Sequence, residues 1–192
     1  MRSSARAHAL RALLVAASAA TVPAAHAAAD PRLCFACHGE NGNSTVPAVP
    51  SLSAQPAQFI ATQLIMFREK RRTDPQMSPI AAPLTNAEIS ELGKFFAGQP
   101  RAAPQRKASD ETLAAGRRIT EQFNCVACHG PALHGQQHIP RLAGQQADYL
   151  RTQLRGFKAG TRFDMDGNMT AAAQPLTPPD IDVLAEYLST LE

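Results

Sequence analysis

The chain contains the pentapeptide Cys34-Phe35-Ala36-Cys37-His38, and the same pattern returns as Cys125-Val126-Ala127-Cys128-His129. These two segments hold all four cysteines, and a glycine follows each segment. Cys-x-x-Cys-His is typical of haem c attachment, because each thiol can form a thioether to a haem vinyl group. The adjacent histidine then reaches the iron as an axial ligand. The sequence therefore predicts two haem c groups, held by Cys34 with Cys37 and by Cys125 with Cys128, with His38 and His129 bound to iron.

Three other uses of the cysteines are open to the sequence alone: a structural zinc site, two disulfides, or a redox-active dithiol. The two pairs lie 91 residues apart, far beyond the spacing of zinc ribbons or fingers. Disulfides would not account for the histidine after each pair, and no alternating strand pattern supports a thioredoxin-like fold. Haem attachment accounts for the whole pattern.

Residues 1–29 have the features of a secretory signal peptide. Three arginines precede a short apolar stretch at 12–20, and Ala25-His26-Ala27 or Ala27-Ala28-Ala29 offers a small-residue cleavage site. The apolar stretch is shorter than the roughly 20 residues that a membrane-spanning helix needs. An uncleaved helix lying at the membrane surface is the alternative. The signal predicts export to the bacterial periplasm, and we expect no membrane span after it.

The charge balance changes once the signal is removed. The chain has 19 basic and 16 acidic residues, and three of the basic residues but no acidic residue lie within 1–29. The exported part, roughly 163 residues, therefore carries 16 residues of each sign. Nucleic-acid-binding proteins carry a basic excess or a basic stripe, so nucleic acid is excluded as a partner.

An internal repeat divides the exported chain into two similar units. Residues 50–64 align with 140–154 at an offset of 90, with seven of the fifteen positions identical. Residues 77–92 then align with 169–184 at an offset of 92. We expect a first domain at 30–98, a linker rich in Pro, Gln and Ala at 99–108, and a second domain at 109–192.

Apolar residues at helical spacing predict the main helices of both units. These helices cover residues 56–68, 86–96, 146–158 and 180–191, and another begins near Ser109. No segment has the pattern of a strand, so the predicted fold class is all-α, with two tandem helical haem domains. A domain of about 80 residues builds only a small core, so we expect a buried haem to supply much of its apolar interior.

The repeat also selects a second axial ligand for each iron. Met77 and Met169 occupy matching positions, seven residues before a leucine–threonine pair. Met66 is interpreted as a core residue, and Met165 is a rival of Met169. Thioether ligation opposite histidine suits electron transfer, because it raises the reduction potential and fills the position where a substrate would bind.

With these motifs the chain resembles the dihaem class I c-type cytochromes of the cytochrome c-four group over nearly all of its exported part. The shared features are two Cys-x-x-Cys-His-Gly motifs, each followed by Pro-x-Leu, Gln-Leu-x-x-Phe, an arginine, a methionine and a Leu-Thr helix start. The resemblance implies four axial ligands, namely His38, Met77, His129 and Met169. It also implies that the carbonyls of Pro50 and Pro140 accept a hydrogen bond from the ligating histidines.

The resemblance implies an electron carrier that is not an enzyme, with a donor of the quinol–cytochrome c reductase type and a terminal oxidase as acceptor. The electron-accepting subunit of a periplasmic dehydrogenase is the alternative. A dihaem peroxidase, which needs an open iron position, is a further alternative.

Domains of this family cross an N-terminal helix over the C-terminal helix, but only a few exported residues precede Cys34. We therefore expect the first haem to be more exposed and lower in potential.

Two histidines, one basic segment and two recurrent arginines remain to be interpreted. His134 and His138 have no counterpart in the first unit and are expected to be exposed loop residues, or else to replace Met169 as a ligand. The basic segment 68–72 is expected to be a solvated helix end, or a docking patch for an acidic partner. Arg72 and Arg162 recur in both units and are predicted to pair with haem propionates.

Overall fold

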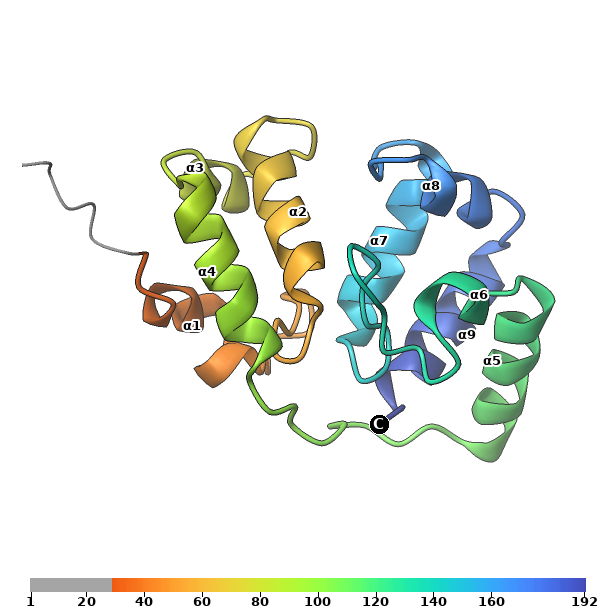
Figure 1. The fold of residues 1–192 in the computed structure, drawn as a ribbon. Coiled ribbons are helices and arrows are strands. Elements are labelled where there is room, and N and C mark those ends of the chain that lie inside the picture. The colour runs from red at the N-terminus through yellow and green to blue at the C-terminus, as the bar shows by residue number, and fades with distance from the viewer. Residues whose placement is uncertain (1–28) are drawn as a thin grey trace, which may run out of the picture.

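The computed structural model describes residues 29–192, so residues 1–28, which hold nearly all of the predicted signal peptide, lie outside the described part. Two groups of helices lie side by side, joined by an extended segment that runs along one edge of the molecule (Figure 1). The first group contains α1 (Arg32–His38), the short 3-10 helix η1 (Glu40–Gly42), α2 (Ala57–Arg68), α3 (Met77–Ala81) and α4 (Asn86–Ala97). The second contains α5 (Asp110–Gln122), α6 (Val126–His129), α7 (Ala147–Ala159), α8 (Asn168–Ala173) and α9 (Pro178–Ser189).

The all-α prediction is confirmed. Residues 29–192 contain no strand, and their one β-like feature is an isolated bridge between Gln136 and Ile139. None of the helices in this part of the chain is long and apolar enough to cross a membrane. The four short helices α1, α3, α6 and α8 were not predicted as separate elements, and they carry the cysteine, histidine and methionine motifs.

The last helix of each group begins at a capping box. Thr85 accepts a hydrogen bond from the backbone of Glu88, whose carboxylate accepts one from the backbone of Thr85. Thr177 and Asp180 repeat this arrangement at α9. Helix α9 begins at Pro178, two residues earlier than predicted, because prolines fit the first turn of a helix, where no N–H donor is needed.

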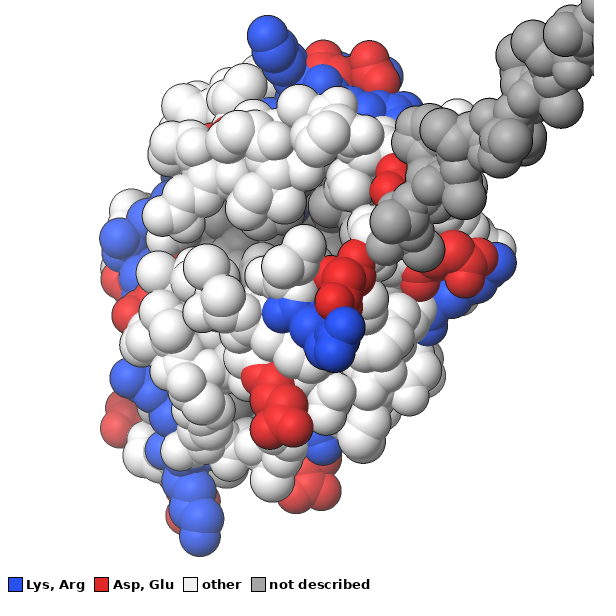
Figure 2. All heavy atoms as spheres, turned by 90° about the vertical axis from the view of Figure 1, so that its left-hand side faces the viewer, with Lys and Arg blue, Asp and Glu red and all other residues white. Residues whose placement is uncertain are grey.

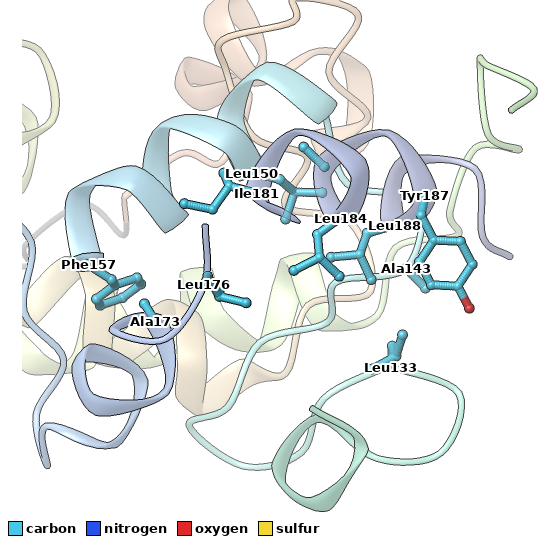
Figure 3. Close-up of a cluster of buried hydrophobic side chains, with 11 residues drawn as sticks. Leu133, Ala143, Leu150, Phe157, Ala173, Leu176, Ile181, Leu184, Tyr187 and Leu188 are labelled. Atoms are coloured by element: carbon cyan, nitrogen blue, oxygen red, sulfur yellow. The ribbon is translucent and has the colours of Figure 1, made fainter. Parts of the chain in front are cut away.

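Each group has its own apolar core. In the first group, α2 packs against α4 and α3, and the buried residues are Ile60, Leu64, Phe67, Ala81, Ile89, Leu92 and Phe96. In the second group, α9 packs against both α5 and α7. Figure 3 shows this second core, in which α9 directs Ile181, Leu184 and Leu188 towards side chains of α7 and the preceding loops. Two separate cores confirm the predicted two-domain architecture.

The second domain has a helix crossing that has no equivalent among the described residues of the first. At this crossing, α5 approaches α9 so closely that a Cβ atom on Gly116 would lie 2.2 Å from Cγ of Tyr187. In the first domain, α1 begins at Arg32, and no helix precedes it within the described residues. The asymmetry predicted between the two domains is therefore present in the part of the chain that the structure describes.

Candidate functional site

The two motif histidines occupy matching positions at the ends of α1 and α6. His38 is 7% exposed and His129 is 6% exposed. The Nδ1 atom of His38 lies 2.8 Å from the carbonyl oxygen of Pro50, and Nδ1 of His129 lies 2.8 Å from that of Pro140. Nδ1 must donate in these contacts, because a carbonyl only accepts. In each ring the proton is therefore on Nδ1, and Nε2 carries a lone pair.

The surroundings of both rings favour the neutral form. Burial lowers the pKa of His38 and of His129, while the hydrogen bond to the proline carbonyl opposes that shift in each case. Within residues 29–192, no hydrogen bond from the protein engages Nε2 of either ring. A neutral, oriented imidazole with an unengaged Nε2 is the state that a metal requires.

The four cysteines lie beside these histidines, on α1 in the first domain and at the start of α6 and within it in the second. Cys34 and Cys125 are half-buried, and burial is the main cause that raises the pKa of both thiols. Cys37 and Cys128 are exposed, and all four thiols are free. Residues three apart on a helix point to the same side, so each pair presents two thiols to one group. In the part of the chain that the structure describes, no three His, Cys, Asp or Glu side chains are placed so that they could hold a zinc ion together.

The predicted methionines lie at the matching short helices α3 and α8. Met77 and Met169 are half-buried, and each packs against the core of its own domain. The rival Met165 has 56% of its surface exposed, whereas Met66 is buried at 3% exposure. The structure therefore favours Met169 over Met165, and it places Met66 in the core as predicted.

An aspartate anchors the backbone of each of these methionines, and neither aspartate was predicted as a site residue. Asp74 accepts a hydrogen bond from the N–H of Met77 at 2.9 Å, and Asp164 accepts one from the N–H of Met169 at 2.8 Å. Asp164 also accepts from the backbone and hydroxyl of Thr170. Burial alone would raise the pKa of Asp164, but these hydrogen bonds outweigh it and lower the pKa. The signal was present in the repeat, as Arg-Thr-Asp at 72–74 and Arg-Phe-Asp at 162–164.

We expect Asp164→Ala to loosen the segment that holds Met169, with a loss of about 1 kcal/mol in the free energy of unfolding, as for other helix-capping side chains. Asp164→Asn should retain part of the stability, because its single amide oxygen can accept from Met169 or from Thr170 but not from both. Guanidinium unfolding of the three proteins, followed by helical circular dichroism, measures the difference. Equal losses in the alanine and asparagine variants would contradict this role.

The two recurrent arginines meet at the boundary between the domains. Arg72 donates to Tyr149 at 3.2 Å and to Gln153 at 3.0 Å, and its guanidinium carbon lies 4.6 Å from the centre of the Phe67 ring. The guanidinium carbon of Arg162 lies 4.4 Å from the centre of the Phe157 ring, in the matching arrangement. Within residues 29–192 neither arginine forms an ion pair with a carboxylate, and the Nε atom of Arg162 is buried without a hydrogen-bond partner.

The charge state of these arginines points to an anionic ligand. Burial is the main cause that lowers the pKa of Arg162 to about 10, and the nearby Arg72 contributes to the shift. Arg162 is still cationic at neutral pH, so two like charges share a partly buried region around Tyr149. Tyr149 and the carboxylate of Asp164 offset part of this cost at Arg162, and a bound anion would offset more of it. Haem propionates have the charge and the hydrogen-bonding capacity to fill this role.

The loop histidines and the basic segment are engaged with other parts of the surface. His134 is exposed and contacts the backbone carbonyl of Glu192 at 3.0 Å, and His138 lies 3.6 Å from Asp166. In the basic segment, Arg68 bonds the carbonyl of Leu84 at 2.9 Å. Arg72 lies at the domain boundary, so the prediction of a wholly solvated helix end is wrong for these two arginines.

Within the described residues, each site combines a pair of free thiols, a buried histidine whose Nε2 makes no hydrogen bond, a half-buried methionine and an arginine without an ion pair. This set of side chains fits haem c. The fold and this site define a two-domain class I c-type cytochrome. The sequence profile of the cytochrome c family matches residues 113–192. Cytochrome c4 of Thiocapsa roseopersicina is 38% identical over 168 residues, which cover 83% of this chain and 87% of the relative. The chain belongs to the cytochrome c4 family, and it is an electron-transfer protein that binds haem c.

Two further similarities agree with this assignment. The crystal structure of reduced recombinant cytochrome c4 from Pseudomonas stutzeri superimposes with a TM-score of 0.76 at 26% identity, over 83% of this chain and 94% of that one. A protein named thiosulfate dehydrogenase electron acceptor, from Thiomonas intermedia, is 32% identical over 180 residues, covering 87% of this chain and 83% of the relative.

Proposed function

We propose that the chain is a periplasmic carrier with two haem c groups, one in each domain. The first domain spans residues 30–98, the linker 99–108 and the second domain 109–192, after removal of a signal peptide at 1–29. The haem thioethers form at Cys34 and Cys37 and at Cys125 and Cys128. The duplicated contact between a buried histidine and a proline carbonyl, beside each free cysteine pair, is the observation that carries this proposal.

The residues of the chain prepare each site for six-coordinate iron. Pro50 and Pro140 fix the tautomer and orientation of His38 and His129, so that each Nε2 lone pair is available. Asp74 and Asp164 hold the backbone of Met77 and Met169, the proposed second ligands. A haem iron held by the histidine and the methionine would supply one-electron chemistry, and the two side chains would leave no position for a substrate. This arrangement suits a carrier and disfavours the peroxidase alternative.

Arg72 and Arg162 are proposed to bind the haem propionates. Both lie at the domain boundary, Arg72 bridges from its own domain to Tyr149 and Gln153 of the second, and no carboxylate within 29–192 pairs with either guanidinium. Propionates bound there would neutralise the two charges.

The proposed partners are a quinol–cytochrome c reductase type donor and a terminal oxidase acceptor. Figure 2 shows a face of the first domain on which Lys, Arg, Asp and Glu occur in small mixed groups and uncharged side chains cover most of the remaining area. Leu33 and Ile80 are exposed apolar residues of this domain. A surface of this kind suits transient contact with an uncharged patch on a partner, and it does not require a strongly basic or acidic one.

A periplasmic dehydrogenase is the second candidate donor, and the similarity to the thiosulfate dehydrogenase electron acceptor of Thiomonas intermedia favours it. The two candidates are separated by supplying the oxidised protein with a purified reductase and quinol, or with a purified thiosulfate dehydrogenase and thiosulfate. The faster reduction identifies the donor class. Reduction by neither would contradict both assignments.

We expect the first haem to have the lower potential, and the structure offers a reason in the second domain. Arg141 is 3% exposed and follows Pro140, whereas the matching residue of the first domain is Ser51. Burial is the main cause that lowers its pKa to about 10, so its guanidinium is charged at neutral pH. A buried positive charge disfavours the ferric state, which carries one more positive charge than the ferrous state.

A redox titration resolved by haem tests this order. We expect two unequal potentials, with Arg141→Ser lowering the potential of the second haem and Arg141→Lys, which keeps the charge, lowering it less. A wild-type protein whose first haem has the higher potential would contradict the expectation.

A further inference from the structure

One peptide group connects the proximal histidine of the first domain to a side chain of the second domain. The carbonyl of Pro50 accepts the hydrogen bond from Nδ1 of His38 at 2.8 Å. The N–H of the same peptide group belongs to Ser51, and it donates to Oε1 of Gln145 at 2.8 Å. Gln145 lies just before α7, in the second domain. The ring of His38 is therefore only one peptide group away from the opposite domain.

The second domain contains the same arrangement in the reverse direction. The carbonyl of Pro140 accepts from Nδ1 of His129 at 2.8 Å, and the N–H of Arg141 donates to Oε1 of Gln55 at 2.9 Å. Gln55 belongs to the first domain. The repeat aligns Gln55 with Gln145 and Ser51 with Arg141. Each glutamine therefore accepts a hydrogen bond from the residue that follows the proline of the opposite domain.

Both glutamines are oriented by a second hydrogen bond. Nε2 of Gln145 donates to the carbonyl of Ser51 at 2.9 Å, and Nε2 of Gln55 donates to the carbonyl of Arg141 at 3.0 Å. Gln55 is 2% exposed and Gln145 is 3% exposed. An amide that accepts from a backbone N–H and donates to a backbone carbonyl has only one suitable orientation. The oxygen of each side chain therefore faces the peptide group next to the histidine.

Hydrogen bonds that share a peptide group strengthen one another. When the N–H of a peptide donates, electron density moves to its carbonyl oxygen, which becomes a better acceptor. A better acceptor for Nδ1–H gives the imidazole more negative character and makes it a stronger iron ligand. A more electron-rich ligand stabilises the ferric state. Each glutamine should therefore lower the potential of the haem in the opposite domain.

We propose that Gln55 and Gln145 are positioning residues that tune the iron ligand of the opposite domain, so that docking of the two domains is part of each redox site. This inference rests on the proposed function, because it takes His38 and His129 to be iron ligands. Under this arrangement, separation of the domains would raise both potentials, and contact between the domains holds them at their working values.

The test uses the full haem-loaded protein and three methionine substitutions of similar volume. Gln145→Met removes the acceptor of Ser51 and should raise the potential of the first haem, while Gln55→Met should raise that of the second. Gln146→Met is the matched control, because Gln146 also makes a hydrogen bond between the domains, from Nε2 to the carbonyl of Ser44 at 2.6 Å, without touching either histidine peptide. A redox titration followed by the haem methyl resonances in NMR assigns each potential to its haem.

The haem on which each substitution acts distinguishes tuning of the iron ligands from a general weakening of the contact between the domains. The inference predicts that each glutamine substitution shifts the potential of the opposite haem more than that of its own, and that the control shifts neither by as much. Equal shifts of both haems in all three variants, or a larger shift of each glutamine's own haem, would overturn it.

Two further measurements separate a failure of the proposed function, or of folding in a variant, from a failure of this inference. If the wild-type protein lacks two haems or a histidine ligand in its spectrum, the proposed function fails; if both are present without the crossed shift, only this inference fails. Hydrogen exchange of the wild-type protein covers the case of a variant that does not fold. The N–H groups of Ser51 and Arg141 lie outside helices but should exchange slowly, and fast exchange at both would overturn the inference.

Discussion

Replacement of Met169 by alanine should remove about half of the weak far-red absorption that ferric iron bound to a thioether sulfur produces. Met169 is half-buried, packs against the second core and is held through its backbone by Asp164. Its loss would leave His129 as the only protein ligand of that iron. We expect the reduction potential of the second haem to fall, because the thioether stabilises the ferrous state, and we expect the open iron to bind small ligands such as cyanide readily.

Met165→Ala is the matched control for this experiment. Met165 lies four residues before Met169, and 56% of its surface is exposed. Its replacement should leave the far-red absorption and both potentials unchanged. If Met165→Ala removed half of the absorption and Met169→Ala did not, the repeat alignment would have selected the wrong methionine. Met77→Ala should remove the other half, with the effect confined to the first haem.

The largest change in haem content is expected from the double substitution of Cys34 and Cys37 by alanine. Without these thiols the first domain has no covalent attachment, and the pyridine haemochrome assay should give one haem c per chain instead of two. The first domain should also lose much of its stability, because a domain of this size has a small core and relies on the haem as part of it. The second domain should keep its haem, since it has its own core around α5, α7 and α9.

The matching substitution of Cys125 and Cys128 provides the control, and it should again leave one haem c. A protein that retains two covalent haems after either double substitution would contradict the attachment sites. Loss of both haems from either variant would show that the two domains do not mature independently.

The sequence predicted the fold class and singled out the proposed iron ligands, because both depend on local patterns that occur twice. A five-residue motif brings His38 next to its cysteines, and the repeat separates Met77 and Met169 from the other methionines. The prediction was less complete where a residue acts through distant partners. The contact of Gln145 with Ser51 spans 94 positions, and nothing in a local pattern indicates which backbone group a glutamine will meet.

Arg68 and Arg72 illustrate the same limit. In the sequence they belong to a short basic run that is typical of a solvated helix end, yet Arg68 bonds the carbonyl of Leu84 and Arg72 crosses to Tyr149 of the other domain. The contact of Arg68 depends on how the first domain folds, and that of Arg72 depends on how the two domains dock. The repeat did indicate a role for Arg72, because an arginine returns at position 162.

If each of the two domains carries one redox-active haem, coulometric titration of the purified wild-type protein should show it, with the electrons counted against the polypeptide concentration. We expect two electrons per chain, taken up in two one-electron steps with haem c as the absorbing species in both. Uptake of one electron per chain, or a second step without a change in haem absorption, would show that the chain does not carry one redox-active haem in each domain.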